Sequence, residues 1–246
     1  MRRLRRAFAF TAVAWLVLLI AGCSGGKAGP TPLAGQSLAS RDPVRQAESC
    51  APASDPLALV LPSLVRITTP PDASGTFSSG TGIIVDQNWV LTNEHVVDGA
   101  ANQRVRTFYR DGHFSMASVV ASSADLDLAL LQANTGDLPA VAWGDEGKLN
   151  DKSVLFSVGY ELGAVSPSAR QGRFVSSTVD RSTGQAFIVS DLQLQHGDSG
   201  GPLLNRCGQV IGINTARIQG LDSNSKLGLS IPGYGARRWA ERNRSQ

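Results

Sequence analysis

Ser199 lies in a glycine-rich segment, residues 195–204, with a glycine two positions before it and another directly after it. Glycines allow a tight turn and let the backbone approach a bound molecule closely. Such a turn exposes the serine hydroxyl and aims the N–H groups of Gly197 and Ser199 at one point, where they would stabilise an oxyanion. Taken alone, the segment also fits a glycine-rich hairpin without chemistry.

A serine hydroxyl attacks effectively only when a base removes its proton, and the chain has three histidines. His113 lies beside a turn at residues 111–112 and is expected at the surface. His196 is too close to Ser199 along the chain to approach it from the opposite wall of a cleft. His95 follows an apolar strand and begins a short helical turn that would hold its ring, so His95 is the predicted base.

The imidazole needs a carboxylate to fix its tautomer and to stabilise its charge. Asp127 directly precedes the apolar residues 128–131, and Asp125 is the competitor two residues earlier. On an extended strand the two carboxylates would share a face, so alternation does not separate them. Asp127 adjoins the buried strand and is better shielded from water, which makes it the predicted partner of His95.

Short apolar runs separated by turn residues fill the chain from Leu57 onward. About a dozen short strands at this spacing indicate an all-β fold, either a barrel or a sandwich. The Asp-Gly pair at residues 111–112 predicts a hairpin, and residues 234–242 are expected to form a short C-terminal helix. The predicted strands are residues 64–68, 81–86, 89–92, 105–109, 114–121, 128–132, 154–158, 174–179, 187–189, 201–204, 210–214 and 227–231.

The first residues predict a targeting segment, residues 1–22, in which arginines precede an apolar run. The run is too short for a comfortable membrane span and ends at Cys23 in a sequence like a bacterial lipoprotein box. We predict that Cys23 is lipidated and becomes the mature N-terminus, so that the protein is exported and anchored to the cell membrane. The alternatives are an ordinary signal peptide and, from Arg5-Arg6, a twin-arginine signal.

The segment after the leader, residues 23–56, is rich in Gly, Ala, Ser and Pro and predicts a flexible tether with an end-to-end distance on the order of 30 Å. Residues 57–246 are then the folded domain. The formal charge is +3, but removing the leader takes away four arginines and leaves 19 basic against 20 acidic residues. The mature chain therefore lacks the basic character of a nucleic-acid-binding protein.

Three cysteines are present, and if Cys23 carries lipid, Cys50 and Cys207 remain. In an oxidising compartment two such thiols are natural disulfide partners, so we predict a bond between them. The alternative is two unrelated, partly buried thiols.

The motifs around these residues resemble those of the HtrA (DegP-like) branch of the chymotrypsin-like serine proteases, which share the chain order His, Asp, Ser. The resemblance covers residues 64–232. It implies two six-stranded antiparallel β-barrels with the triad in the crevice between them, protein or peptide substrates, and no metal or cofactor. The matching segments are residues 80–85, 91–97, 127–131, 190–201, 208–216 and 227–232.

The resemblance also assigns roles around the triad. Thr215 would donate a hydrogen bond to Asp127. Together with Ala216 and Arg217 it would form the edge that pairs with an extended substrate. Gln193 stands six residues before the serine, where trypsin-like enzymes place an acid at the base of the specificity pocket. A neutral residue there argues against cleavage after Arg or Lys and favours small or medium apolar residues.

Two features depart from the HtrA pattern. About a dozen residues follow the last motif, so we expect no PDZ domain in this chain. Asp198 stands where HtrA proteins usually carry asparagine. We expect its side chain to turn inward beneath the oxyanion loop and to meet either an internal cation or a set of main-chain donors. The candidate cations are Arg170 and Arg173, with Arg173 preferred. An outward-facing, solvated Asp198 is the alternative.

Together these features predict a serine endopeptidase that hydrolyses peptide bonds of extracytoplasmic proteins. One competing hypothesis is a non-catalytic binding or chaperone-like lipoprotein on a protease scaffold, which would be expected to lack a member of the triad. Another is an enzyme that cuts only its own tether. The sequence leaves the oligomeric state open.

Overall fold

The computed structural model describes residues 55–71, 75–219 and 226–244. The chain separates into residues 1–45, which lie outside the described residues, and a compact unit, residues 46–246, which contains every described element. The predictions for the leader, for Cys23 and Cys50, and for nearly all of the tether fall outside the described residues.

The first six strands close into an antiparallel barrel in the order β1-β2-β3-β6-β5-β4. Gly112, with φ 90°, turns the chain between β4 and β5, where the Asp-Gly pair predicts a hairpin. Two short helical segments, α2 (Glu94–Val97) and η2 (Ala101–Gln103), lie between β3 and β4. The strands are β1 (Leu64–Thr68), β2 (Ser79–Asp86), β3 (Trp89–Thr92), β4 (Arg104–Phe108), β5 (Phe114–Ser123) and β6 (Leu128–Gln132).

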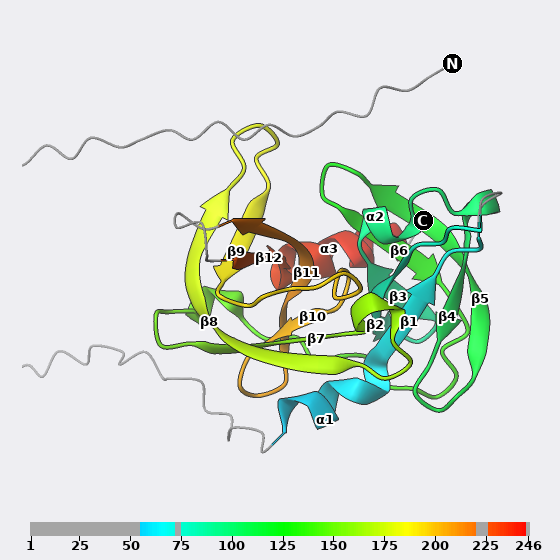
Figure 1. Ribbon diagram of the computed structural model, residues 1–246, viewed down its shortest axis with the longest axis horizontal. Helices are drawn as coiled ribbons and strands as arrows, with labels where there is room; N and C mark the ends of the chain where they lie inside the picture. The colour runs from blue at the N-terminus through cyan, green and yellow to red at the C-terminus, as the bar shows by residue number, and fades with distance from the viewer. Residues whose placement is uncertain (1–54, 72–74, 220–225, 245–246) are drawn as a thin grey trace, which may run out of the picture. The chain divides into compact units, whose positions relative to one another are not determined.

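The other six strands form a second closed antiparallel barrel, in the order β10-β11-β12-β9-β8-β7 (Figure 1). The expected architecture of two six-stranded barrels and a C-terminal helix is confirmed. The strands are β7 (Val154–Gly159), β8 (Ser168–Val179), β9 (Ala186–Ser190), β10 (Pro202–Leu204), β11 (Val210–Gln219) and β12 (Lys226–Pro232), with η3 (Glu146–Lys148), η4 (Glu161–Gly163) and α3 (Gly233–Arg244) outside the sheet.

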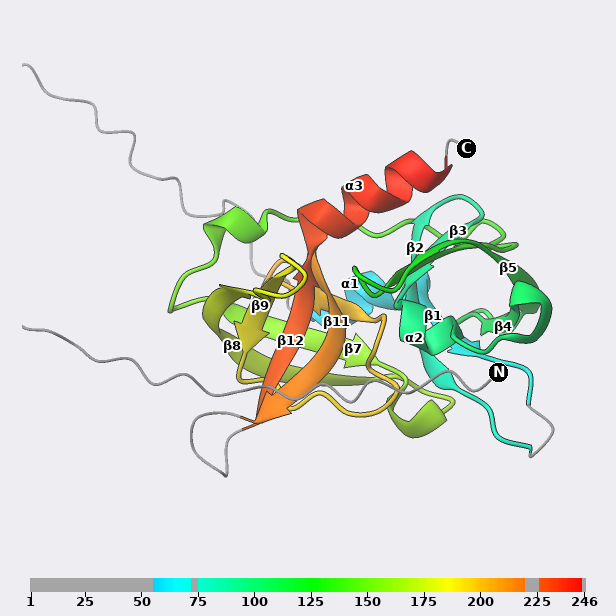
Figure 2. The ribbon, with the colours of Figure 1, turned by 90° about the horizontal axis from the view of Figure 1, so that it is seen from above.

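Each barrel has its own apolar core, and a third cluster lies between the barrels. Strand β6 shows why its sequence is apolar throughout: Ala129 and Leu131 face the first core, whereas Leu128 and Leu130 face the cluster between the barrels. Helix α3 packs on β11, β12 and β6 and adds Trp239 to that shared cluster (Figure 2). This shared core fixes the two barrels against each other and therefore fixes any site formed between them.

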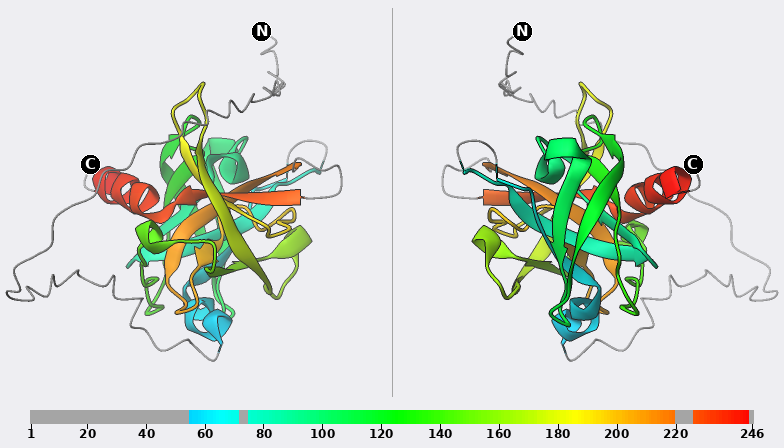
Figure 3. Two further views of the ribbon diagram at one scale, coloured as in Figure 1. Left: turned by 90° about the vertical axis from the view of Figure 1, so that its left-hand side faces the viewer. Right: turned by 90° about the vertical axis from the view of Figure 1, so that its right-hand side faces the viewer.

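The sequence pattern missed the first half of one strand and the helical segments that begin the described chain. Strand β8 begins at Ser168 rather than at residue 174, because the polar segment 168–172 pairs with β7 although it has no apolar alternation. Helix α1 (Pro56–Val60), followed by η1 (Leu61–Ser63), begins the described chain (Figure 3). Asp55 caps α1 by accepting hydrogen bonds from the N–H groups of its first turn. None of the helices within the described residues is long and apolar enough to cross a membrane.

Candidate active site

His95 is the second residue of α2, directly after β3. Strand β3 pairs with β6 so that Thr92 lies opposite Ala129, and this register brings Asp127, just before β6, beside the start of α2. The Nδ1 atom of His95 lies 2.9 and 3.0 Å from the two carboxylate oxygens of Asp127. The main-chain N–H of His95 donates to the same carboxylate at 3.1 Å. Two bonds from one residue thus fix both the ring and its backbone on Asp127.

Asp127 rather than Asp125 faces the histidine. Residues 124–127 form a turn, and Asp127 has φ 49°. The chain is therefore not an extended strand at these residues, although the comparison of Asp125 with Asp127 from the sequence assumed one. Asp125 is exposed, whereas the side chain of Asp127 is 22% exposed. Asp127 also accepts a hydrogen bond from the hydroxyl of Thr215 on β11, so the second barrel reaches the carboxylate as the resemblance implies.

The pKa of His95 is raised above its ordinary value. Partial burial disfavours the imidazolium and acts in the opposite direction, but the hydrogen bond to Asp127 and the negative charges of Asp127 and Glu94 outweigh it. The site therefore stabilises the protonated form of the ring. A general base must hold a proton in this way during the reaction.

Ser199 lies in the turn that we call the serine loop, residues 195–201. Gly197 and Gly200 have φ 98° and 81°, and a Cβ atom at either position would lie 2.2 Å or less from a main-chain or hydroxyl oxygen. Only glycine fits both positions. Within the described residues no group accepts a hydrogen bond from the N–H of Gly197 or of Ser199. The Ser199 hydroxyl donates to the main-chain oxygen of Thr215 at 3.2 Å.

Thr81 of β2 connects the first barrel to the serine loop. Its buried hydroxyl donates to the main-chain oxygen of Gly197 at 2.6 Å and accepts from the N–H of Tyr160 at 2.9 Å. Its own N–H donates to the main-chain oxygen of Ser199 at 2.9 Å. No role of Thr81 was predicted from the sequence, since a threonine in a glycine-rich strand carries no signal of such a contact.

Asp198 points inward, as expected, and its side chain is only 1% exposed. Its Oδ2 atom accepts hydrogen bonds from Arg170 Nη1 and from the N–H of Gln195, both at 2.8 Å. Arg170 also forms an ion pair with Glu161 of η4. An internal cation thus faces the carboxylate below the serine loop.

The preference for Arg173 as the partner of Asp198 was wrong. Because β8 already begins at Ser168, its side chains alternate across residues 168–173, and Arg170 lies on the inner face while Arg173 is exposed. Arg173 instead donates its main-chain N–H to Asp191 at 2.6 Å. The error arose because the first half of β8 was not predicted from the sequence.

The pKa of Asp198 is raised, because burial disfavours its charged form more than the N–H of Gln195 and the charge of Arg170 favour it. The nearby charge of Glu161 raises it further. The Oδ1 atom is buried without a hydrogen-bond partner in the described part of the chain. It lies so close to Gly159 that a Cβ atom there would be 2.6 Å away, which explains the glycine at the end of β7.

The histidine and the serine line one cavity of about 320 Å³. Gln193 is exposed and is not among the lining residues. Ala216 is exposed on β11 next to Thr215, and β11 continues through Arg217. The cavity is lined by Ser78, Ser79, His95, Val96, Leu162, Gly163, His196, Gly197 and Ser199.

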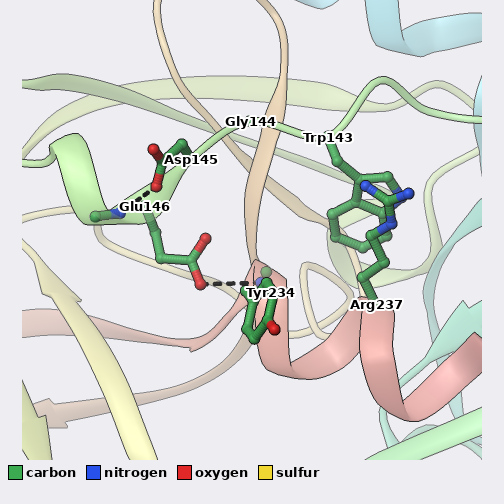
Figure 4. A pocket seen from close by; sticks show the side chains of 8 residues that line it. Trp143, Gly144, Asp145, Glu146, Tyr234 and Arg237 are labelled. Carbon is green, nitrogen blue, oxygen red and sulfur yellow. Dashed lines mark hydrogen bonds between the residues drawn. The ribbon is translucent and has the colours of Figure 1, made fainter.

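A larger cavity of about 420 Å³ lies elsewhere, between η3 and the start of α3 (Figure 4). Trp143, Tyr234 and Arg237 line it, and Glu146 accepts a hydrogen bond from the N–H of Tyr234 at 2.9 Å. Its lining contains no serine, cysteine or histidine, so it offers no counterpart to the Ser199 and His95 pair. Across the described ranges, no three His, Cys, Asp or Glu side chains cluster as a metal site would require.

The arrangement can support acyl transfer. It has a hydroxyl on a glycine-rich turn, two N–H groups beside it that donate to no group in the described part of the chain, and an imidazole held by a carboxylate in the same cleft. Residues 80–213 match the family model of the trypsin-like peptidase domain.

Curated relatives match the same region. A probable periplasmic serine endoprotease, DegP-like, from Chlamydia trachomatis is 33% identical over 165 residues, which cover 65% of this chain and 32% of the relative. The serine protease Do-like HtrA of Bacillus subtilis is 33% identical over 169 residues, 63% of this chain and 36% of the relative. The chain thus spans about a third of the length of these relatives.

Solved structures show the same fold. A structure titled as the HtrA-type protease AlgW with decapeptide superposes with a TM-score of 0.68 at 24% identity, covering 78% of this chain and 67% of that one. Another, titled AlgW with tripeptide, has a TM-score of 0.66 at 27% identity and covers 74% and 60%.

Proposed function

Because the chain belongs to the family of trypsin-like peptidase domains, we propose that it is a serine endopeptidase that hydrolyses peptide bonds of extracytoplasmic proteins. The observation that carries this proposal is the chain of hydrogen bonds from Thr215 through Asp127 to His95, in the cleft that also holds Ser199. Curated relatives named as serine endoproteases support it.

In the proposed mechanism Ser199 attacks the peptide carbonyl while His95 takes its proton and later gives it to the leaving amine. The hydroxyl must first rotate away from the main-chain oxygen of Thr215 toward the imidazole. Asp127 orients the ring and stabilises its charge. The N–H groups of Gly197 and Ser199 would hold the oxyanion, and water then hydrolyses the acyl-enzyme.

The substrate would bind as an added β-strand along β11. Beyond Ile213 this strand pairs with β12 and no longer with β10, so its other edge at Thr215, Ala216 and Arg217 has no strand partner among the described elements. Gln193, a neutral residue, favours small or medium apolar side chains before the cleaved bond. Cleavage of a peptide library tests this preference, and a strict requirement for Arg or Lys would contradict it.

The mechanism is tested most directly by labelling with a fluorophosphonate probe, which reacts with an activated serine. We expect the unmodified chain to be labelled and the Ser199→Ala variant to remain unlabelled. A chain that takes no label but still binds unfolded polypeptide would reject the enzyme in favour of a non-catalytic, chaperone-like protein.

We further propose that residues 1–22 are a leader, that Cys23 carries the lipid anchor, and that residues 23–56 tether the protease domain, residues 57–246, outside the cytoplasm. The short apolar run before Cys23 and the periplasmic names of relatives support this assignment. Cys23→Ser should release the protein from the membrane fraction without loss of peptidase activity. A correctly processed variant that stays with the membrane would contradict the anchor.

A disulfide between Cys50 and Cys207 is the remaining part of the proposal. Its support is the start of α1, which lies over the turn after Cys207: a Cβ atom at Gly208 would be 2.9 Å from the Leu59 side chain and 3.4 Å from the main-chain oxygen of Pro56. Five residues lie between Cys50 and Pro56, which is enough chain to reach. Mass analysis of the unreduced protein checks the bond, and two free thiols would exclude it.

A further inference from the structure

Asn93 lies between β3 and α2, two residues before His95, and is fully buried. Its dihedrals, φ −82° and ψ 154°, are those of a residue that caps a helix. An asparagine in this position usually turns its side-chain oxygen to the free N–H groups of the first turn. Here the side chain makes no cap bond, so the reason for asparagine lies elsewhere.

The side chain reaches across to Asp127 instead. Asn93 Nδ2 donates a hydrogen bond to the main-chain oxygen of Asp127 at 2.8 Å, between residues 34 positions apart. A carbonyl oxygen only accepts, so the amide must present its nitrogen here; turned over, it would set two oxygens against each other.

The backbone of Asp127 has an unusual conformation, which such a bond would stabilise. Its φ of 49° lies in the left-handed region that non-glycine residues seldom adopt. A residue in that region is strained and persists only where neighbouring contacts hold it. The unusual backbone aims the carboxylate at the ring and the N–H of His95. A bond at the carbonyl of the same residue therefore helps to set the direction of its side chain.

The other end of the amide is left unsatisfied. Asn93 Oδ1 is buried and has no hydrogen-bond partner among the described residues. A buried acceptor without a partner lowers stability, and an apolar side chain of similar size would avoid that loss. The Nδ2 bond to Asp127 is the contact that accounts for asparagine at this position.

Asn93 also touches the serine loop through its backbone. A Cβ atom at Gly200 would lie 3.1 Å from the main-chain nitrogen of Asn93. One residue thus adjoins the helix that carries His95, the backbone of Asp127 and the turn that carries Ser199.

We propose that Asn93 is a positioning residue that holds the backbone of Asp127 so that its carboxylate stays aligned with His95. This inference rests on the proposed peptidase function. It adds a residue that acts on the triad through the main chain of Asp127. Asn93 does not touch the substrate in this account, so its loss should affect the chemical step and leave substrate binding intact.

The test replaces Asn93 with Leu, which keeps the approximate size and removes the donor, and with Ala, which removes the whole amide without adding a charge. Small displacements of a catalytic group cost up to roughly 100-fold in rate, so we expect kcat to fall about 10- to 100-fold with KM unchanged. The acid limb of the pH–rate profile should move to lower pH, because a misplaced Asp127 raises the pKa of His95 less. Unchanged kcat and an unchanged acid limb in both variants would overturn the inference.

Asn88→Ala is the matched control. Asn88 also has a positive φ, 66°, and its side chain accepts from the N–H of Thr135, but it lies at the opposite end of β3. This variant should lose thermal stability without any change in the acid limb. A similar shift of the acid limb in Asn88→Ala would mean that general destabilisation, and not the contact to Asp127, moves the histidine.

NMR titration of His95 in the unmodified chain and in Asn93→Leu, which adds no charge near the ring, separates this inference from the proposed function. A lower pKa of His95 in the variant supports the positioning role even if no peptide substrate is found. An equal pKa in both proteins overturns it. A folded, unmodified chain without any peptidase activity or fluorophosphonate labelling would instead reject the proposed enzyme.

Discussion

The two sides of the cleft are held by different means. On the first barrel, His95 and Asp127 lie at the ends of paired, buried strands and are joined by hydrogen bonds, one of them from the main chain. On the second barrel, the serine loop lies outside the strands. It is held by an ion pair between the buried Asp198 and the partly exposed Arg170 and by the hydroxyl of Thr81, which comes from the first barrel.

This difference shows which side depends on the packing of the whole molecule. The histidine side follows from the register of two neighbouring strands. The serine side needs a cation from β8, a hydroxyl from β2 and the close contact of the two barrels. We therefore expect the serine loop to be more sensitive to substitutions far from it in sequence, and the following variants test that expectation.

The largest effect should come from removing either reacting group. Ser199→Ala and His95→Ala should each lower peptide hydrolysis by about 10⁴-fold or more, and the double variant should lose little more, because both residues act in one step. Single-turnover and steady-state kinetics check this. Losses that add up in the double variant would mean that the two sides of the cleft do not act together.

Arg170→Met should give the next largest effect. It leaves the 1% exposed carboxylate of Asp198 without its cation. Breaking one side of a fully buried pair costs about 3–5 kcal/mol, and the cost here should be lower, because the side chain of Arg170 is 25% exposed and the carboxyl can take up a proton. Without the ion pair the serine loop should shift. Because its N–H groups would then no longer point at the oxyanion, kcat should fall by about 100-fold. Melting temperature and kcat are measured together.

Arg173→Met is the matched control for this variant, since it lies three residues along the same strand with an exposed side chain. It should change neither quantity. Replacing both members of the pair, Arg170→Met with Asp198→Asn, removes the isolated charge and should regain part of the lost stability. No recovery in the double variant would show that Arg170 does not act through Asp198.

Thr81→Val should have a smaller effect on the same loop. Valine keeps the shape but removes the hydroxyl that binds the main-chain oxygen of Gly197 and the N–H of Tyr160. Loss of these buried bonds should cost about 1–3 kcal/mol and should lower kcat with little change in KM. Thr107→Val, which removes a fully buried hydroxyl inside the first barrel, should destabilise the protein without that loss of kcat.

The sequence predicted the histidine side well because its signals are local. The bounds of β1, β3 and β6 agree with the predicted strands, and an apolar run directly follows Asp127. The glycines of the serine loop were also informative, since their positive φ values are required by close backbone contacts.

The contacts that hold the serine loop were harder to predict. Arg170 could not be distinguished from Arg173, because the polar first half of β8 has no apolar alternation from which to infer its faces. Thr81 was part of a recognised motif, but its hydrogen bond joins residues 116 positions apart. On the histidine side, the bond from Asn93 to Asp127 was missed for the same reason, since it joins residues 34 positions apart. Such contacts depend on how strands and barrels meet, which a local pattern does not contain.

The smallest expected effect concerns the charge around His95 on the first barrel. Partial burial lowers the pKa of His95, but the hydrogen bond to Asp127 and the negative charges of Asp127 and Glu94 together raise it above its ordinary value. His95 must be neutral to act as a base, so activity should rise as the pH passes upward through this raised pKa, and the acid limb should lie above the ordinary histidine range near 6.5. Glu94→Gln removes one of the two charges but leaves the Asp127 hydrogen bond, so the acid limb should move to lower pH while the plateau rate stays nearly constant.

Asp111→Asn is the control, since Asp111 pairs with His113 in the β4–β5 hairpin and not with His95. If the acid limb stays in place in Glu94→Gln, or moves equally in Asp111→Asn, the charge of Glu94 does not act on His95 and the hydrogen bond to Asp127 alone sets the proton affinity of the ring.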